Sequence, residues 1–185
     1  MAPLCRPQPC GGSSDPDRIN ATTLRGGRVR RSGGGSRDRT WFAYPETILV
    51  FAGERHTLAL DLRRPLGELD REALAALRMP APFGVVTAAN PIGGELSHAE
   101  NQSRHEALRT RLESSGLRRR LAADGVSPDG SHREAGFAIH ASRDEIRRLA
   151  NEFEQSAFFW FDGSAFWLVD ATDDSYEIRL PPDER

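Results

Sequence analysis

The chain has 185 residues, of which 38% are hydrophobic, so it is long enough for one domain with a buried core and a tail. All 25 basic residues are arginine, which excludes chemistry that depends on lysine, such as Schiff-base formation or a P-loop. Residues 1–40 contain eight Arg and three Asp (net +5), whereas the remainder contains 17 Arg and 24 acidic residues (net −7), and an acidic body is not typical of a nucleic-acid-binding domain.

Residues 1–40 are rich in Gly, Ser, Pro and Arg, a composition that predicts a disordered arm. Cys5 and Cys10 lie in this arm, and their C-x4-C spacing without a second Cys pair or a His nearby predicts neither a zinc site nor a disulfide framework. The Arg-Gly pattern at residues 25–31 could contact nucleic-acid phosphates weakly. We do not favour this alternative, because such charge runs are commonly solvated tails.

The rest of the chain contains no cysteine, which fits a reducing cytoplasm. No apolar stretch of a signal peptide follows the start, and no run approaches the roughly 18 apolar residues that span a membrane. We therefore expect a cytoplasmic protein without a membrane partner. The absence of lysine, with many Ala, Gly and Pro residues, is typical of a GC-rich bacterial genome.

One α+β domain is predicted over residues 41–180, with a short tail at residues 181–185. Apolar runs bounded by Gly, Pro or Asp predict strands, and apolar residues at helical spacing predict helices. The predicted strands are residues 47–51, 57–62, 83–88, 117–123, 136–141, 157–161 and 164–169, the predicted helices are residues 66–77, 97–116 and 142–153, and residues 124–130 are predicted as a loop. This order, ββ-α-β-α-ββ-α-ββ, predicts a single mixed or antiparallel sheet of about six to seven strands with about three helices.

Three short patterns support these boundaries. Ser97 with Glu100, and Ser142 with Glu145, have the spacing of a capping box, in which a serine hydroxyl and a glutamate carboxylate satisfy free amides at a helix start. The dipeptide Asp162-Gly163 between two aromatic runs is typical of a tight hairpin turn.

Polar side chains gather at residues 87–104, between the third predicted strand and the second predicted helix. The junction of a strand end and a helix start is a common position for a binding site. Asn101 has helical spacing with Leu108 and Leu112, which places it on the core-facing stripe, where an unpaired amide costs about 1–3 kcal/mol. It bonds either the turn at Asn90, the structural use that we favour, or a ligand.

Arg104 lies one turn into the same predicted helix. Its guanidinium could hold an anionic group near the positive end of the helix, although an ion pair with Glu100 or Glu134 is equally ordinary. For Glu100 we favour the capping role over a chemical one.

The histidines form no recognisable metal motif. His98 and His105 are seven residues apart, about 10 Å along a helix, which is too far for one ion. A metal site of His105, His132 and Glu134 is conceivable but has no tight spacing to support it. We predict no metal site and no cofactor, and no G-x-S-x-G serine or cysteine outside the arm suggests a hydrolase nucleophile.

Four segments resemble, in order and spacing, the DUF3293 family, a bacterial family of unknown function. They are T-A-A-N-P at residues 87–91, A-E-N-Q-S-R at 99–104, R-E-A-G-F at 133–137 and E-Q-S-A at 154–157. The resemblance covers about residues 44–169 and leaves the arm out. It implies a compact single domain with no assigned activity.

The resemblance also implies which residues make up the family motif. These positions are Thr87, Asn90, Pro91, Glu100, Asn101, Arg104, Glu134 and Gln155. The aromatic residue that usually precedes the family's glutamate by two positions is His132 in this chain. The resemblance therefore leaves open whether the surroundings of Glu134 differ from those of the family.

These observations give three hypotheses of function. The first is a binding domain whose pocket holds a small polar or anionic ligand through Thr87, Asn90, Asn101, Arg104, Glu134 and Gln155. The second is an enzyme in which Glu134 or Glu100 is the acid/base and Arg104 stabilises an anion. The third is a nucleic-acid-associated protein that uses the arm. We rank it last because the rest of the chain is acidic.

Overall fold

The computed structural model describes residues 44–92 and 94–182. The predicted arm at residues 1–40 and the end of the predicted tail, residues 183–185, lie outside the described residues.

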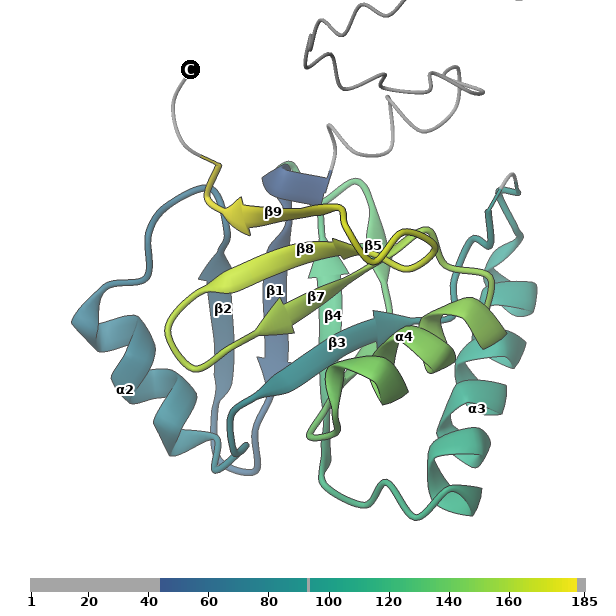
Figure 1. Ribbon diagram of the computed structural model, residues 1–185, viewed down its shortest axis with the longest axis horizontal. Helices are drawn as coiled ribbons and strands as arrows, with labels where there is room; N and C mark the ends of the chain where they lie inside the picture. Colours follow the sequence, from purple (N-terminus) through teal and green to yellow (C-terminus); the bar gives the residue numbers. More distant parts are fainter. Residues whose placement is uncertain (1–43, 93, 183–185) are drawn as a thin grey trace, which may run out of the picture. The chain divides into compact units, whose positions relative to one another are not determined.

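The described chain forms a single layered α+β structure, as the sequence predicts (Figure 1). Its strands are β1 (Ile48–Ala52), β2 (Thr57–Asp61), β3 (Phe83–Thr87), β4 (Arg120–Val126), β5 (Arg133–Glu134), β6 (Gly136–Ile139), β7 (Ala157–Phe161), β8 (Phe166–Asp170) and β9 (Glu177–Leu180). Its helices are the 3-10 turn η1 (Tyr44–Glu46) and the α-helices α2 (Glu68–Ala76), α3 (His98–Ser114) and α4 (Arg143–Glu152).

The predicted order of elements is confirmed, but the strand count is higher than predicted. Strand β5 has two residues, and β9 follows the last predicted strand. Strand β4 continues through Val126 into the stretch predicted as loop, because Asp124 and Gly125 pair with Val50 and Leu49 of β1. Pairing to a neighbouring strand outweighs the weak strand propensity of Asp and Gly.

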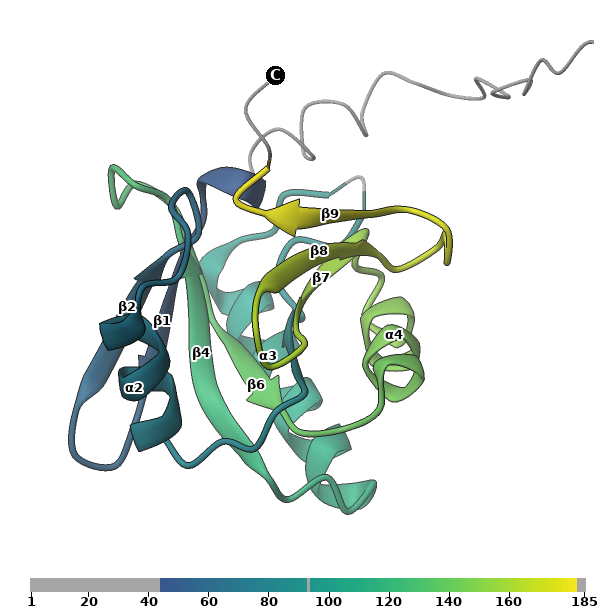
Figure 2. The ribbon, with the colours of Figure 1, turned by 60° about the vertical axis from the view of Figure 1, so that its left-hand side comes forward.

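All strand pairs are antiparallel, and the strands follow the order β2-β1-β4-β6-β3-β7-β8-β9, with β5 paired to β4. The sheet is curled, so that β1 and β2 face the β7–β9 end across its concave side (Figure 2). This curl creates two separate apolar layers, one inside the curl, which Leu74 of α2 joins, and one under α3 and α4.

Strand β7 illustrates both layers, because its alternate side chains point to opposite faces. Phe159 and Phe161 belong to the inner cluster, whereas Phe158 and Trp160 belong to the cluster that α3 and α4 cover. Close approach of α4 requires Gly84 in β3, since a Cβ atom at this position would lie 2.5 Å from Cγ2 of Ile146.

The local sequence signals produce the expected contacts. The Ser97 hydroxyl accepts a hydrogen bond from the Glu100 amide at 3.3 Å, and the Glu100 carboxylate accepts one from the Ser97 amide at 2.8 Å. Ser142 and Glu145 form the second box in the same way. The Asp162-Gly163 turn joins β7 to β8. No helix among the described residues is long and apolar enough to cross a membrane.

Candidate functional site

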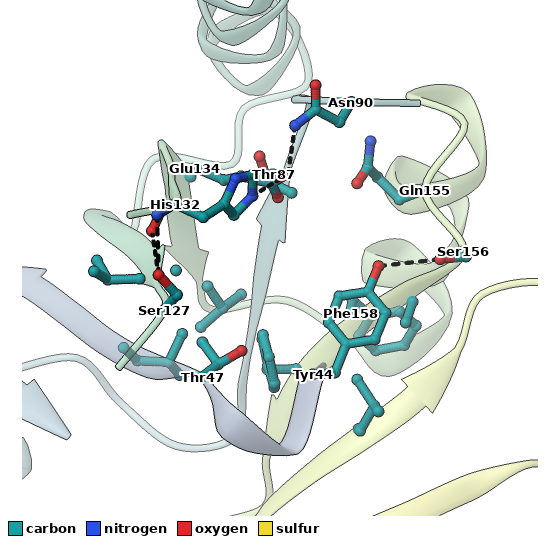
Figure 3. A pocket seen from close by; sticks show the side chains of 18 of the residues that line it. Tyr44, Thr47, Thr87, Asn90, Ser127, His132, Glu134, Gln155, Ser156 and Phe158 are labelled. Atoms are coloured by element: carbon teal, nitrogen blue, oxygen red, sulfur yellow. Dashed lines mark hydrogen bonds and ion pairs between the residues drawn. The ribbon is translucent and has the colours of Figure 1, made fainter. Parts of the chain in front are cut away.

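A cavity of about 800 Å³ opens at one end of the curled sheet, where β3 and β4 end and β6 and β7 begin (Figure 3). Its inner wall continues the concave core through Leu49, Val85, Phe159 and Leu168. Its size and apolar wall are those of a site for a small molecule. The remaining lining residues are Tyr44, Glu46, Thr47, Thr87, Asn90, Pro91, Ile92, Gly94, Glu95, Ala123, Gly125, Val126, Ser127, Pro128, His132, Glu134, Gly136, Gln155, Ser156, Ala157 and Phe158.

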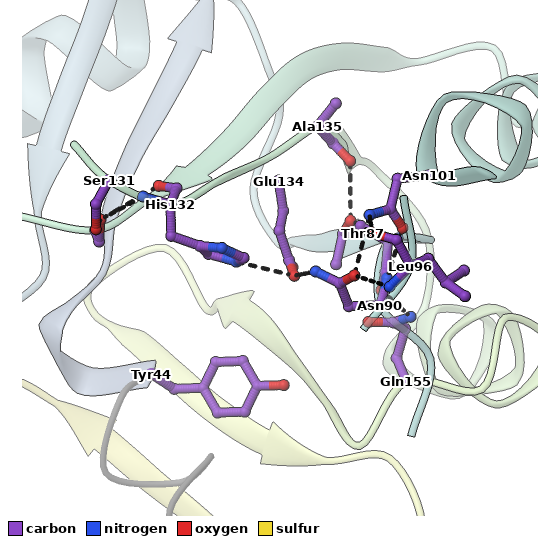
Figure 4. A network of polar contacts seen from close by, with 12 residues as sticks. Tyr44, Thr87, Asn90, Leu96, Asn101, Ser131, His132, Glu134, Ala135 and Gln155 are labelled. Atoms are coloured by element: carbon purple, nitrogen blue, oxygen red, sulfur yellow. Dashed lines mark hydrogen bonds and ion pairs between the residues drawn. The ribbon is translucent and has the colours of Figure 1, made fainter. Parts of the chain in front are cut away.

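Asn90 is the centre of the polar network at the mouth (Figure 4). It has a left-handed backbone with φ of 43°, a conformation that asparagine tolerates better than most residues. Its side-chain oxygen accepts from the Leu96 amide at 3.1 Å and from Nδ2 of Asn101 at 3.0 Å, and its own Nδ2 donates to Oε1 of Glu134 at 2.9 Å. These bonds fix the β3–α3 loop as the wall of the cavity.

Asn101 does not line the cavity. Its Oδ1 accepts from the Asn90 amide at 2.9 Å, and its Nδ2 donates to the Leu96 carbonyl as well as to Asn90. Of the two uses open to this amide, the structure has the bond to the Asn90 turn. Asn101 thus lies on the core-facing stripe of α3, where it bonds the β3–α3 loop without lining the cavity.

Arg104 also lies outside the cavity lining. Its Nε donates to the Ala88 carbonyl and its Nη2 to the Phe153 carbonyl, both at 2.6 Å, while Nη1 lies 3.4 Å from Glu154. The guanidinium therefore joins the end of β3 to the end of α4. None of the described residues that line the cavity is an arginine.

Thr87 and Gln155 line the cavity with different capacity for a ligand. The Thr87 hydroxyl donates to the Ala135 carbonyl at 2.9 Å and accepts from the Ala89 amide at 3.0 Å. The buried Gln155 donates from Nε2 to the carbonyls of Ala89 and Phe153. Its Oε1 accepts no hydrogen bond from any described residue, and Figure 3 shows this oxygen directed into the cavity.

Glu134 brings a carboxylate to the same cavity. Its Oε1 accepts from Asn90 and lies 3.1 Å from Nε2 of the exposed His132. Within residues 44–92 and 94–182, no donor contacts Oε2 of Glu134. The cavity thus presents two acceptor atoms, on Glu134 and Gln155, that accept no hydrogen bond from the described residues.

Two lining residues, Tyr44 and Ser156, had not been predicted as site residues. Their hydroxyls are 3.1 Å apart, and burial raises the pKa of Tyr44, with nearby Glu134 and Asp170 acting in the same direction. The Tyr44 hydroxyl is therefore protonated at neutral pH. Ser156 lies within the E-Q-S-A segment of the family resemblance, which was a usable signal, whereas Tyr44 comes from a distant segment.

The acidic residues Glu46 and Glu95 complete the mouth, and both are exposed. With Glu134 they make the cavity electronegative. Glu100, by contrast, does not line the cavity, and hydrogen bonds donated by Ser97 lower the pKa of its carboxyl.

The histidines lie apart. His105 stacks on Phe137 with ring centroids 4.7 Å apart, and its Nδ1 is buried without a partner among the described residues. His132 stands at the rim of the cavity beside Glu134. Across the described part of the chain, no group of three or more His, Cys, Asp or Glu side chains could hold a metal ion.

Residues 86–158 match the family model DUF3293, described as a protein of unknown function. This match confirms the resemblance found in the sequence, and it contains all six predicted ligand-binding residues. The matched segment leaves out Tyr44 and Glu46 at the mouth. No curated protein and no solved structure shows significant similarity to the chain.

Proposed function

We propose that this domain binds a small polar ligand in the cavity at the open end of the curled sheet. The observation that carries the proposal is the pair of unused acceptors, Oε2 of Glu134 and Oε1 of Gln155, at the border of an apolar wall. Both oxygens face the cavity and accept no hydrogen bond from a described residue, so a ligand that donates to both gains affinity.

The charge of the lining favours a neutral or cationic ligand over an anionic one. Glu46, Glu95 and Glu134 surround the mouth, and the guanidinium of Arg104 is engaged elsewhere by Ala88 and Phe153. An anion would meet three carboxylates and no arginine of the described lining. We therefore propose a ligand with an amine, amidine or amide donor group attached to an apolar body, which would lie against Leu49, Val85 and Phe159.

A thermal-shift screen of the full chain tests this proposal. The panel contains small amines, guanidines and amides on one side, and carboxylates and nucleotides on the other. We expect stabilisation by members of the first group only. Stabilisation confined to anionic compounds, or by no compound, would contradict the proposal.

Glu134→Gln separates charge from shape in this site. Glutamine keeps a carbonyl oxygen for the Asn90 amide, while it removes the negative charge. Loss of a hydrogen bond to a charged group costs about 1.5–3 kcal/mol, so affinity for a cationic hit should fall roughly 10- to 100-fold. Glu72→Gln, an exposed residue of α2 outside the cavity, is the matched control and should leave affinity unchanged.

An enzyme is the second candidate, because Glu134 faces the cavity in contact with His132. A carboxylate that Asn90 holds by one oxygen, and whose other oxygen contacts no donor of the described residues, is suitably placed for proton transfer to a bound molecule. The alternative acid/base, Glu100, has no support from the site, because its carboxylate caps α3. A hit that is chemically altered by the wild-type chain, and unaltered by Glu134→Gln, would favour this candidate.

We further propose a bacterial source and a cytoplasmic location, which rest on the arginine-only composition and on the cysteine-free sequence after the arm. Weak nucleic-acid contact through the arm at residues 1–40 stays the third proposal. Salt-dependent RNA binding that persists when all eight arginines of the arm are replaced would contradict it.

A further inference from the structure

A second hollow, of about 490 Å³, lies at the opposite end of β1 and β4 from the cavity. Three segments form it: the β1–β2 turn, the residues that follow α2, and the chain that leads into β4. Figure 1 shows all three at the lower end of these strands, away from η1. The turn and the end of α2 are tightly packed, since a Cβ atom at Gly53 would lie 2.8 Å from Cδ2 of Leu77 and 2.9 Å from the His56 carbonyl oxygen.

Five arginines line this hollow against a single acidic residue, Glu54. They are Arg55, Arg78, Arg118, Arg119 and Arg120. Only Arg120 has an ion pair, 2.8 Å from Glu113, among the described residues. The other four have no ion pair within the described chain, although most other described arginines do.

The positions of these arginines are fixed by the backbone. Arg78 has a left-handed φ of 56° directly after α2, and its amide donates to the Ala75 carbonyl at 3.0 Å. The Arg119 carbonyl accepts from the His140 amide at 3.0 Å, and the Arg120 amide donates to the Arg118 carbonyl at 3.1 Å. Arginine residues from three separate segments thus line one concave surface, in a body whose net charge is negative.

We propose that this hollow binds a small phosphorylated molecule. Arginines that line one hollow without ion pairs to described residues repel one another, and a bound anion relieves this repulsion. Phosphate matches the planar fork of arginine in a bidentate manner and carries more than one negative charge near neutral pH. The hollow is within the size range of small-molecule sites. It is separate from the acidic cavity, so this proposal does not depend on the function proposed for that cavity.

The test uses the full chain, inorganic tripolyphosphate and isothermal titration calorimetry at physiological ionic strength. The double variant Arg118→Gln with Arg119→Gln removes two charges and keeps long polar side chains. We expect its affinity to fall on the order of tenfold or more. The control Arg148→Gln with Arg179→Gln removes the same charge from α4 and β9, far from the hollow, and should change affinity less than about twofold because exposed distant charges are screened.

Equal losses in the two double variants would overturn the proposal, because they would indicate diffuse attraction, including attraction to the arm. No binding to the wild-type chain would overturn it as well. Binding of single-stranded RNA with the same dependence on Arg118 and Arg119, but without tripolyphosphate binding, would replace the small ligand by a nucleic acid. Glu134→Gln should leave tripolyphosphate binding unchanged, which keeps this result separate from that of the cavity.

Discussion

Asn90 and Asn101 hold each other through two hydrogen bonds, one from the Asn90 backbone amide to Oδ1 of Asn101 and one from Nδ2 of Asn101 to Oδ1 of Asn90. The pair joins the loop after β3 to the first turns of α3. Asn90 then orients Glu134 through its remaining amide donor. A residue that does not touch the cavity therefore determines how the cavity presents its carboxylate.

Replacement of Asn101 by leucine should destabilise the protein although leucine suits the core-facing stripe of α3. The change leaves the Asn90 amide without its partner and removes one of the two hydrogen bonds that the Asn90 side-chain oxygen accepts, which should lower the free energy of unfolding by about 1–3 kcal/mol. Urea denaturation measures this difference. The control is Gln102→Leu at the exposed neighbouring residue, which should change the free energy of unfolding by less than about 0.5 kcal/mol. An Asn101→Leu protein as stable as wild type would show that the bonds between Asn90 and Asn101 are dispensable.

Arg104→Lys should be destabilising despite the retained charge. A single ammonium group cannot reproduce the two directed bonds to the Ala88 and Phe153 carbonyls, so we expect a loss of about 1–3 kcal/mol in the free energy of unfolding. Arg109→Lys is the matched control on the same helix. Arg109 forms an exposed ion pair with Glu106. Arg109→Lys should therefore lower the free energy of unfolding by at most about 0.5 kcal/mol. Equal effects of the two substitutions would refute the joining role of Arg104.

Gly84→Ala should be destabilising by about 1–3 kcal/mol, because the new methyl group would overlap Ile146 of α4. Thermal or urea unfolding of a double-mutant cycle with Ile146→Ala measures the coupling. The cost of the alanine should be smaller in the background that lacks the isoleucine side chain. Additive effects would place the origin of the cost elsewhere in β3.

Asp162 should make the stability depend on pH in the acid range. Burial raises the pKa of its carboxyl, but hydrogen bonds donated by Ala165, Ser164 and Trp167 outweigh that effect and lower the pKa to about 2. The folded-state pKa is below the ordinary value of 3.8, so the stabilisation is fully present above 3.8 and is lost as pH falls from 3.8 towards about 2.

In Asp162→Asn this part of the pH dependence should disappear, with lower stability than wild type near neutral pH. The free energy of unfolding measured against pH by urea denaturation, with far-UV circular dichroism as the probe, follows both effects. Glu72→Gln should preserve the wild-type profile. A profile of Asp162→Asn that is parallel to wild type down to pH 2 would mean that the turn does not hold the ionised carboxylate.

The sequence predicted the fold well where local chemistry decides it. The two serine capping boxes and the Asp162-Gly163 turn depend only on neighbouring residues, so their boundaries could be found without the structure. Strand β5 was missed because two residues carry no periodic pattern. The extension of β4 was missed because Asp124 and Gly125 become strand only through pairing with other strands, Asp124 with β1 and Gly125 with β1 and β5.

The candidate site was only partly predictable. The position of Asn101 on an apolar stripe indicated a buried amide in need of partners, and the structure supplies those partners. The sequence could not show that the partners of Arg104 are backbone carbonyls at Ala88 and Phe153, 16 and 49 residues away. For the same reason, the sequence could not distinguish the residues that shape the cavity from residues such as Glu134 and Gln155, which have an acceptor oxygen without a partner among the described residues.

The hydrogen bonds of Asn90 are made within the protein, which has a consequence for how ligand selectivity could change among related proteins. Asn90, Asn101 and Arg104 build the wall with contacts inside the protein, whereas Glu46 and Glu95 stand exposed at the mouth with no structural bond described for either. Exchange of these two glutamates for neutral residues would reduce the negative charge at the mouth, and exchange for basic residues would reverse it, at little cost to folding. The residues that shape the cavity are thus different from those that set the charge at its mouth, so under the proposed function ligand preference could evolve while the shape stays constant.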